Sequence, residues 1–499
     1  MRHVCCAAVL LFCLKVVALQ APAQTVSPTP APTQSVSTTS GPTTVYTLPP
    51  DKLEKSKALY DVRVKMRFIG TVWSFVVLLA ILYLGIAAKY RDWAERASNY
   101  KAIQILGAVI GVVAILLGGT GLLLFARRFL HVSNVRFYTL LFLLAVLLYF
   151  AIRYHRYWSQ LWSQALIIVP LLLLTIDLLS LPLDAYEHNI SLRYGLSVQG
   201  WGSWFWDQLK GEIIGLILGT LLLWLMIIII RKSPKRWWFW FWFPLYAVFV
   251  LLMYGGPWII DPLFNKFSPL DKNNPQLVSQ IEKLTERSGL SNPRSRMFEM
   301  DASKKTNELN AYVAGFGASK RIVVWDTTIQ KTTTPETLFV VGHEMGHYVL
   351  NHVIYGLVLG AIGIFITLYV IYLVSHWLVR HFAGRWHIRE LGDWAALPMI
   401  FLILNVVGFL ALPVANSISR QFEHNADIYG LEVTHGINAD SQEAGAHAFQ
   451  TLGEISLVYP HPSRLLTFWY GSHPSIPDRV RFAHEYDPWS KGEPPKYVK

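Results

Sequence analysis

The sequence predicts a mainly α-helical, polytopic membrane protein, on the evidence of its composition and its apolar runs. The chain has 499 residues, of which 53% are hydrophobic and 15% are charged. Many of the hydrophobic residues form unbroken runs long enough to cross a bilayer. The 19 Trp and 23 Tyr are typical of a chain that meets membrane interfaces repeatedly. Most of the Lys and Arg behind the net charge of +12 lie in short connectors, which favours anionic lipid headgroups over nucleic acid as the partner.

The N-terminus has the order of a secretory signal. In residues 1–23 a basic start precedes an apolar run, and Ala21–Ala23 offers a small-residue cleavage site. An uncleaved anchor is the alternative, because Lys15 interrupts the run. Residues 24–66 are then expected to be a Thr/Pro-rich disordered linker and a basic segment. All three cysteines lie in the first 13 residues, which excludes cysteine-based zinc sites and thiol nucleophiles farther along.

Eight apolar segments predict about seven to eight membrane spans. They are residues 68–88, 102–126, 137–152, 163–183, 212–230, 237–259, 353–379 and 394–412. We therefore expect an N-terminal transmembrane domain over 67–259 and a second domain over 260–499 that the last two spans interrupt. Lys and Arg divide almost evenly between the two sets of connectors, so they assign no orientation.

Two features of the spans bear on function. Asp177 is an intramembrane acid, but it is expected near the end of its span, before Leu181–Leu183, which favours a solvated or structural role. The connector over 184–211 is rich in Trp, Tyr and Gly and is expected to pack against a membrane face.

The chemistry is concentrated in one short motif. Thr334 is a plausible N-cap and Pro335 suits the first helical position, so a helix is expected to begin here. On that helix His343 and His347 project from one face and can share a zinc ion. Glu344 is rotated away from direct ligation but is near enough to hold a metal-bound water, as a general base does. Two ordinary surface histidines are the alternative interpretation.

A third ligand is needed, and a later segment offers one. Glu423 and Asp427 are four residues apart on an expected helix. Glu423 is a candidate zinc ligand, and Asp427 is a candidate acceptor for the outer nitrogen of a ligand histidine. His424 is a competing ligand, although it points about 100° away from Glu423 on a helix. A solvated acidic face is the alternative.

Together these motifs resemble the integral-membrane zinc endopeptidases typified by the type I CAAX prenyl protease, the a-factor-converting (Ste-type) enzyme. Further matching segments are Asp261–Phe267, Asn310–Tyr312, Ser319–Val324, Ser472–Pro474 and, more weakly, Tyr90–Arg96. The resemblance implies one zinc ion per chain in a gluzincin-like peptidase domain that carries a small β-sheet. The chain departs from the family in its Thr/Pro-rich leader and in its number of spans.

The substrate side of the site follows partly from pattern and partly from this resemblance. Residues 321–326 alternate as a half-buried strand would, with a core hairpin as the alternative interpretation. With Asn310, Ala311 and Tyr312 before it, this strand suggests an edge on which an extended peptide pairs. His473 resembles the family histidine that helps to polarise the scissile carbonyl.

The function predicted is a membrane-embedded zinc metalloendopeptidase in which Glu344 activates a zinc-bound water. An HtpX-like quality-control peptidase is the second hypothesis, and a receptor or transporter with a structural zinc site is the third. The expected partners are the bilayer and a peptide or protein substrate, and the resemblance implies lipid modification of that substrate. A bacterial inner or plasma membrane is favoured over the endoplasmic reticulum, and nucleic acid is not expected.

Overall fold

The computed structural model describes residues 46–129, 155–290, 293–315 and 320–498, with a few single positions between 137 and 149. The expected signal peptide (1–23), the first part of the linker and most of the span expected at 137–152 lie outside the described residues.

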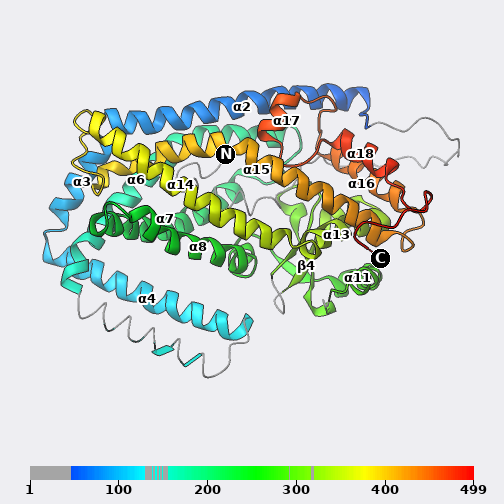
Figure 1. Cartoon of the computed structure of the whole chain (residues 1–499), viewed down its shortest axis with the longest axis horizontal. Coiled ribbons are helices and arrows are strands. Elements are labelled where there is room, and N and C mark those ends of the chain that lie inside the picture. The colour runs from blue at the N-terminus through cyan, green and yellow to red at the C-terminus, as the bar shows by residue number, and fades with distance from the viewer. Residues whose placement is uncertain are drawn as a thin grey trace.

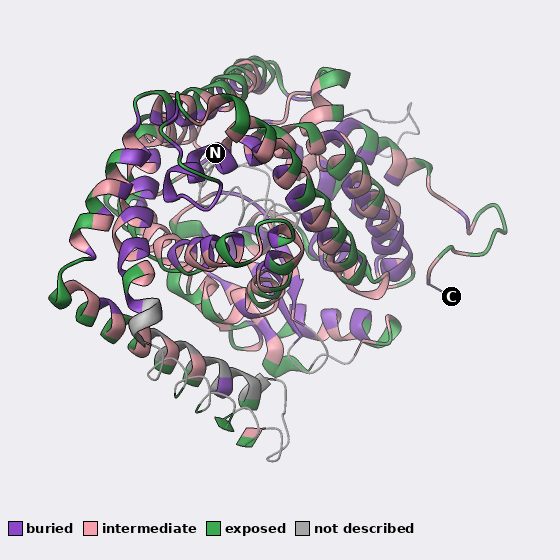
Figure 2. Cartoon of the chain, turned by 60° about the vertical axis from the view of Figure 1, so that its left-hand side comes forward, coloured by how far each residue is buried: buried purple, intermediate pink, exposed green. Residues whose placement is uncertain are grey.

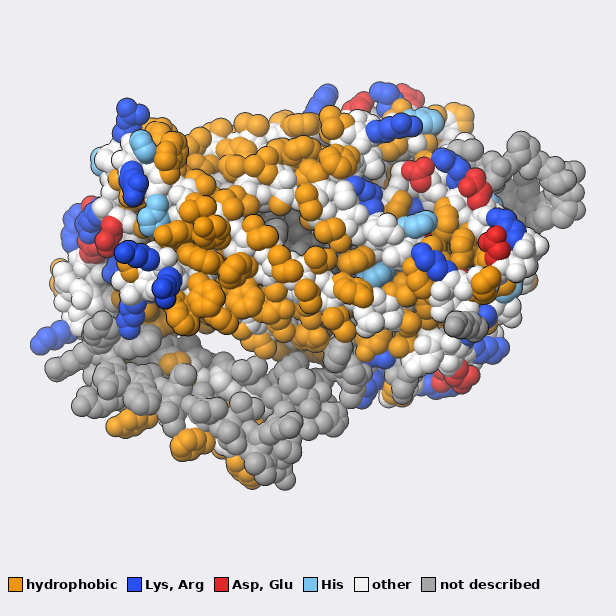
Figure 3. Space-filling view, viewed as in Figure 1, with side chains coloured by type: hydrophobic (Ala, Val, Ile, Leu, Met, Phe, Trp, Pro, Cys, Tyr) orange, Lys and Arg blue, Asp and Glu red, His pale blue; other side chains and the backbone are white. Residues whose placement is uncertain are grey.

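Long helices form one end of the molecule, and shorter helices with a small sheet form the other (Figure 1). The long-helix part contains α2 (Pro50–Tyr83), α3 (Ile86–Ala97), α4 (Lys101–Phe129), α6 (His155–Arg193), α7 (Trp201–Lys232), α8 (Trp237–Ile259), α14 (His352–Phe382) and α15 (Leu397–Thr434). In the described chain, six helices are long and apolar enough to cross a membrane. A broad band of hydrophobic side chains covers this part, and charged side chains gather toward both ends (Figure 3). The chain is thus the mainly helical, multi-pass protein that its composition predicts.

The spanning helices pack around a shared apolar core. Buried side chains from α2, α3, α6, α7, α8, α14 and α15 form one cluster, in which Leu78, Ile168, Ile227 and Trp237 are fully buried. Figure 2 shows buried residues on the inward-facing sides of these helices and exposed residues on their outer sides. The exposed sides are themselves apolar, as lipid contact requires.

Several boundaries differ from the sequence expectation. The basic segment after Pro50 is helical and continuous with the first span, which ends at Tyr83, before Gly85 takes a left-handed conformation (φ 61°). α6 continues through Pro182 to Arg193, so Asp177 lies well inside the helix and not near its end. The expected 184–211 connector is correspondingly short, because α7 begins at Trp201. Membrane helices tolerate such internal prolines, because neighbouring helices and side chains satisfy the backbone groups that a proline leaves unpaired.

The last span also extends past its expected end. We expected it to stop at residue 412, but α15 is one helix over Leu397–Thr434, and it passes Pro413 without a break. The helix that leaves the membrane part is therefore the same helix that carries Glu423 and Asp427.

The remaining elements form the mixed α/β part. They are α9 (Asp261–Phe264), β1 (Phe267–Pro269), α10 (Leu270–Asn273), α11 (Pro275–Arg287), β2 (Met297–Met300), β3 (Ala311–Ala314), β4 (Arg321–Trp325), α12 (Asp326–Lys331), α13 (Thr334–Val349), α16 (Ser441–Ile455), α17 (Arg464–Tyr470) and α18 (Ile476–Glu485). The sheet order is β1-β2-β4-β3, with β2 parallel and β3 antiparallel to β4. The strand predicted over 321–326 is β4, but four of its five residues, Arg321–Val324, are buried, so the expectation of a half-buried, alternating strand was wrong. The segment before it forms an edge strand of the sheet.

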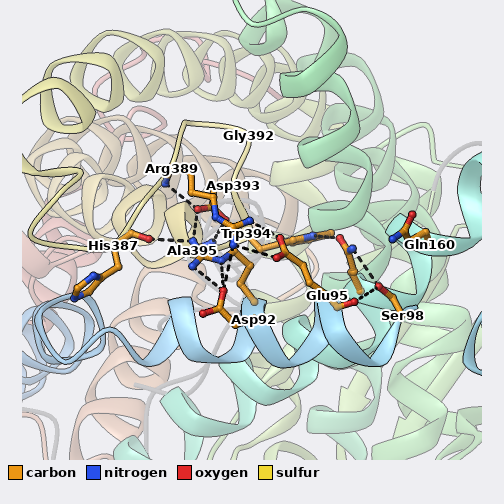
Figure 4. Close-up of polar contacts among 12 residues, drawn as sticks. Asp92, Glu95, Ser98, Gln160, His387, Arg389, Gly392, Asp393, Trp394 and Ala395 are labelled. Carbon is orange, nitrogen blue, oxygen red and sulfur yellow. Dashed lines mark hydrogen bonds and ion pairs between the residues drawn. The ribbon is translucent and has the colours of Figure 1, made fainter. Parts of the chain in front are cut away.

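A polar network fixes the turn between α14 and α15 to α3, at the end of the molecule away from the sheet (Figures 1 and 4). Arg91 donates from Nη1 to Asp393 Oδ2 at 2.6 Å and to the carbonyl of His387 at 3.0 Å. Asp393 also accepts the backbone N–H groups of Arg389 and Ala395. Both side chains of the Arg91–Asp393 pair are buried, so each charge depends on the other.

We expect Asp393→Asn to destabilise the protein by roughly 3 kcal/mol, because it removes the buried counter-ion of Arg91 and leaves only the more exposed Asp92 to pair with that charge. The measurement is the thermal unfolding midpoint of the full chain in detergent. Glu95→Gln is the matched control: Glu95 binds Arg389 at an exposed position, so its loss is expected to cost less than about 1 kcal/mol. Equal midpoints for Asp393→Asn and the wild type would contradict the assignment.

Candidate metal centre

The helix that carries the histidine motif, α13, has a defined start. Its N-cap is Thr333, and Glu336 Oε2 accepts the backbone N–H of Thr333, which makes a capping box. The helix therefore begins one residue earlier than the sequence suggested. Thr334 is the first helical residue and not the cap. This corrects the predicted cap without changing which face the histidines occupy.

Three glycines bring α13 and α15 into close contact. A Cβ atom on Gly342 would lie 2.8 Å from Val433 Cγ1, and one on Gly346 would lie 3.0 Å from Tyr429 Cβ. From the other helix, a Cβ atom on Gly430 would meet the backbone N of His343 at 3.1 Å. Any larger side chain at these positions would push the two helices apart. The backbone of α15 therefore passes close to the backbone at His343.

This contact places His343, His347 and Glu423 together. Their ligand-type atoms, one from each residue, all lie within 4.8 Å of one another. The two Nε2 atoms are 3.3 Å apart, and Glu423 places Oε2 3.3 Å from His343 Nε2 and Oε1 3.5 Å from His347 Nε2. Glu423 is 2% exposed. We refer to these three residues as the cluster.

The outer nitrogen of each histidine lies close to another polar side chain. His343 Nδ1 lies 2.9 Å from Asp427 Oδ1, and His347 Nδ1 lies 3.0 Å from His352 Nδ1. Burial lowers the pKa of His347 to about 3, which keeps that ring neutral. Both Nε2 atoms are consequently turned toward Glu423. Burial also acts to lower the pKa of His343, but the carboxylates of Asp427 and Glu423 act in the opposite direction and raise it to about 10. Two imidazole nitrogens and one carboxylate form a donor set that suits zinc.

Asp427 is held in turn from its other side. Arg479, on α18, donates from Nη2 to Oδ1 at 2.5 Å and from Nε to Oδ2 at 3.0 Å. The guanidinium thus fixes the carboxylate that faces His343 and compensates its charge. The sequence motif predicted Asp427 in this position but gave no sign of Arg479.

A cavity of about 450 Å³ opens beside the cluster. Glu344 lines it together with His343 and Glu423 but lies outside the cluster itself. Burial raises the pKa of Glu344 to about 7. A carboxyl group with that pKa, beside a metal site and facing a cavity, is suited to exchange a proton with a molecule bound there.

The other predicted site residues lie at different distances from this cavity. His473 lines it, and its Nε2 atom is 3.3 Å from Glu423 Oε2 while Ser472 Oγ lies 2.9 Å from its Nδ1. Asn310 also lines the cavity. Ala311 is buried, and Tyr312 points away, with its hydroxyl group donating to Asp261. The structure therefore brings His473 to the cluster and Asn310 to the cavity, but it brings the side chains of Ala311 and Tyr312 to neither.

Sequence reasoning missed two contacts of this centre. His352, the first residue of α14, contacts His347 and stacks on Phe422 at 4.4 Å between ring centroids. Arg479 lies in a different helix from every other member of the site. His424, the competing ligand, stacks instead against Phe482. The five-residue spacing from His347 to His352 could have indicated their contact, whereas nothing in the sequence indicated the contact of Arg479 with Asp427.

Comparison with known proteins gives consistent matches over most of the chain. Residues 271–487 match the profile of peptidase family M48, and residues 127–266 match the CAAX prenyl protease N-terminal region, described as five membrane helices. The chain is 35% identical over 438 residues to the uncharacterized metalloprotease YhfN of Bacillus subtilis, covering 88% of this chain and 87% of that protein.

Two proteins of lower sequence identity match the chain as well. The chain is 30% identical over 305 residues to a CAAX prenyl protease 1 homolog of Arabidopsis thaliana, covering 60% of this chain and 69% of that protein. The crystal structure of S. mikatae Ste24p shares the fold, with a TM-score of 0.55 and 22% identity over 77% of this chain and 98% of that one.

The glycine contact gives a sharp prediction. Gly430→Ala is expected to push α15 away from α13 and to lower metal affinity by about 10- to 100-fold, the range seen when ligand support is disturbed. The measurement is metal content after dialysis against graded chelator. Gly408→Ala is the matched control, since it lies on the same helix with nothing within 4 Å of the added atom. Unchanged metal affinity in Gly430→Ala would show that the helix spacing does not set the cluster.

Proposed function

The chain belongs to peptidase family M48, and from this premise we propose that it is a membrane-embedded endopeptidase that uses one zinc ion per chain. The proposed ligands are His343, His347 and Glu423. The observation that carries the proposal is the convergence of two imidazole Nε2 atoms and one carboxylate beside a cavity that His343 and Glu423 line. Glu344 faces the same cavity without joining the cluster, as a proton-transfer group should.

The residues present fit a zinc ion. Glu423 Oε2 is buried and accepts no hydrogen bond from any described residue, an arrangement that is costly for a carboxylate without a cation. Two histidine nitrogens face it, and their outer nitrogens are held by Asp427 and His352. Three protein ligands with room on the cavity side are typical of catalytic zinc sites, whereas structural sites are closed by four.

The proposed reaction is hydrolysis of a peptide bond. A zinc ion held by His343, His347 and Glu423 would supply the Lewis acidity that makes a water molecule more acidic and polarises the scissile carbonyl. Glu344 accepts the proton of the attacking water and then delivers it to the leaving nitrogen. His473 donates a hydrogen bond to the carbonyl oxygen as negative charge develops there. Arg479 and Asp427 keep His343 oriented throughout.

We propose that the substrate lies extended along β3. The backbone N–H of Asn310 donates to Thr328 Oγ1 on α12, and its carbonyl accepts the N–H of Trp325 on β4, so both groups face the inner side of the strand. By strand alternation, the backbone groups of Ala311 face the open edge of the sheet. An extended peptide can pair with that edge through main-chain hydrogen bonds. This assigns Ala311 a backbone role and Tyr312 a supporting one, because its hydroxyl group anchors the strand to Asp261.

The finer identity of substrate and membrane is also proposed. Relatives named CAAX prenyl proteases support a substrate that is lipid-modified near its end, in preference to the misfolded membrane proteins of the quality-control hypothesis. The Bacillus relative supports a bacterial plasma membrane over the endoplasmic reticulum. A receptor or transporter is not favoured, because the chain belongs to a peptidase family.

The ligand assignment predicts a loss of metal. Replacing His343, His347 or Glu423 with Ala should lower zinc affinity by about 10- to 100-fold or more, and Asp427→Ala should have a milder effect through His343. Zinc is quantified per chain on purified protein, with His424→Ala as the control from the same helix. Stoichiometric zinc in Glu423→Ala would contradict the ligand set.

The proposed role of Glu344 predicts that its loss affects peptide hydrolysis but not zinc binding. Glu344→Gln should retain zinc, because the residue is not a ligand, but peptide hydrolysis should fall by at least about 100-fold. Turnover of a fluorogenic peptide and zinc content are measured on the same preparation. A variant that loses its zinc would show that Glu344 has a different role.

The strand assignment predicts a backbone-specific defect. Ala311→Pro removes one backbone donor from the open edge and should reduce turnover of unrelated peptides alike, while zinc content stays unchanged. Ala311→Ser is the matched control, since it keeps the donor. Asn310→Ala should weaken turnover more mildly. Wild-type rates in Ala311→Pro for every peptide would place the substrate elsewhere.

A further inference from the structure

The first turns of α2 form part of the active-site wall. The chain before α2 is fastened to the peptidase part by the Tyr46 hydroxyl group, which donates to the carbonyl of Val458 at 2.8 Å. Lys52 pairs with Glu454 at 2.5 Å, and the backbone N–H of Ser463 donates to the Tyr60 hydroxyl group. Leu59 is buried against Leu457 and its neighbours. A helix assigned to the membrane part is thereby held against the catalytic part.

Two arginines on this helix line the catalytic cavity. Arg63 and Arg67 are four residues apart, so they lie on one face of α2, and both line the cavity that Glu344 and Glu423 line. Lys65, between them, is exposed and does not line the cavity. Two basic side chains of this segment, Arg63 and Arg67, therefore face the cavity, so the segment does not serve lipid headgroups alone.

Neither of these positive charges is paired within the described chain. A third cavity arginine, Arg479, is bound by the carboxylate of Asp427, whereas the described residues offer Arg63 and Arg67 no ion pair. Arg63 Nη2 is buried without a hydrogen-bond partner among those residues. The Arg67 guanidinium lies 5.4 Å from the ring centroid of Tyr470, a contact that leaves its N–H groups available.

Two acidic residues act on these arginines through their charge: Glu187 acts on both and Glu308 on Arg63, but within the described chain neither forms an ion pair with them. Glu308 is buried, and that burial raises its pKa to about 9 even though the charge of Arg63 acts in the opposite direction. It is therefore largely uncharged at neutral pH. A buried guanidinium group with an unmet donor is costly unless an anion completes it.

We propose that Arg63 and Arg67 bind the C-terminal carboxylate of the peptide substrate and so direct cleavage to the end of a chain. Two guanidinium groups on one helix face can hold a carboxylate through several charge-assisted hydrogen bonds. A free C-terminus is the anion that a peptide brings into the cavity whatever its side chains are. Main-chain pairing with β3 gives little sequence selectivity, so this contact supplies the positional selectivity that the strand lacks. The inference rests on the proposed endopeptidase function.

The test compares peptides that differ only at the terminus. One ends in a free carboxylate, the second in a carboxamide, and the third in a carboxamide with Glu as its last residue. For the wild type, kcat/KM is expected to be about 10-fold or more higher for the free acid than for the amide, the size expected of charged hydrogen bonds. Arg63→Gln and Arg67→Gln should each reduce that ratio toward one by slowing the free acid alone. Arg63→Lys should retain part of it.

Controls separate this contact from folding and from the proposed function. Lys65→Gln should keep the wild-type ratio, and zinc content should be the same in every variant. Peptide binding is also measured without turnover, in the Glu344→Gln background, where the free acid should bind about 10-fold or more tightly than the amide. If no peptide is cleaved but this preference is present, the proposed function fails and the carboxylate site stands.

Three results would overturn the carboxylate site. The first is equal rates and equal binding for free acid and amide in the wild type. The second is an equal loss for both peptides in the arginine variants, which would indicate a structural or lipid-binding role. The third is a rate for the carboxamide that ends in Glu as high as the rate for the free acid. That result would make the ligand a side-chain carboxylate.

Discussion

The spacing between α13 and α15 is the constraint on which the rest of the site depends. His343 and His347 belong to one helix and Glu423 to the other, so the distance between the helices sets the distance between the residues. Glycine is required where the helices touch, although each helical glycine costs about 1 kcal/mol relative to alanine. The fold accepts that cost at Gly342, Gly346 and Gly430, because any side chain there would separate the cluster.

Charge in this buried site is compensated in a chain of contacts. Arg479 binds Asp427, Asp427 faces His343, and His343 faces Glu423. Each member is fixed by the next, so orientation and charge balance come from the same contacts. The outer end of this chain, Arg479, belongs to α18, which ties the C-terminal helices to the chemistry although they contribute no proposed ligand.

The sequence predicted the local parts of this arrangement and missed those that depend on tertiary contact. The spacing of His343 and His347, and of Glu423 and Asp427, follows from helical geometry, which is local. Arg479 reaches its partner only after α18 folds back, and no spacing in the sequence encodes that. The end of the last span was placed too early because polarity rises after residue 412, whereas the helix continues since its buried face then packs on α13. Pro182 suggested an end for a similar reason, yet α6 passes through it.

The order of the site residues along the chain has a consequence for biosynthesis. His343 and His347 are made before α14 and α15, whereas Glu423 lies beyond the apolar part of α15. A ribosome delivers the two histidines first, and the third member of the cluster follows only after a hairpin of two long apolar helices has emerged. Three protein ligands are needed for a catalytic zinc site. The proposed ligand set is therefore complete only after the last membrane hairpin and the polar end of α15 have been synthesised.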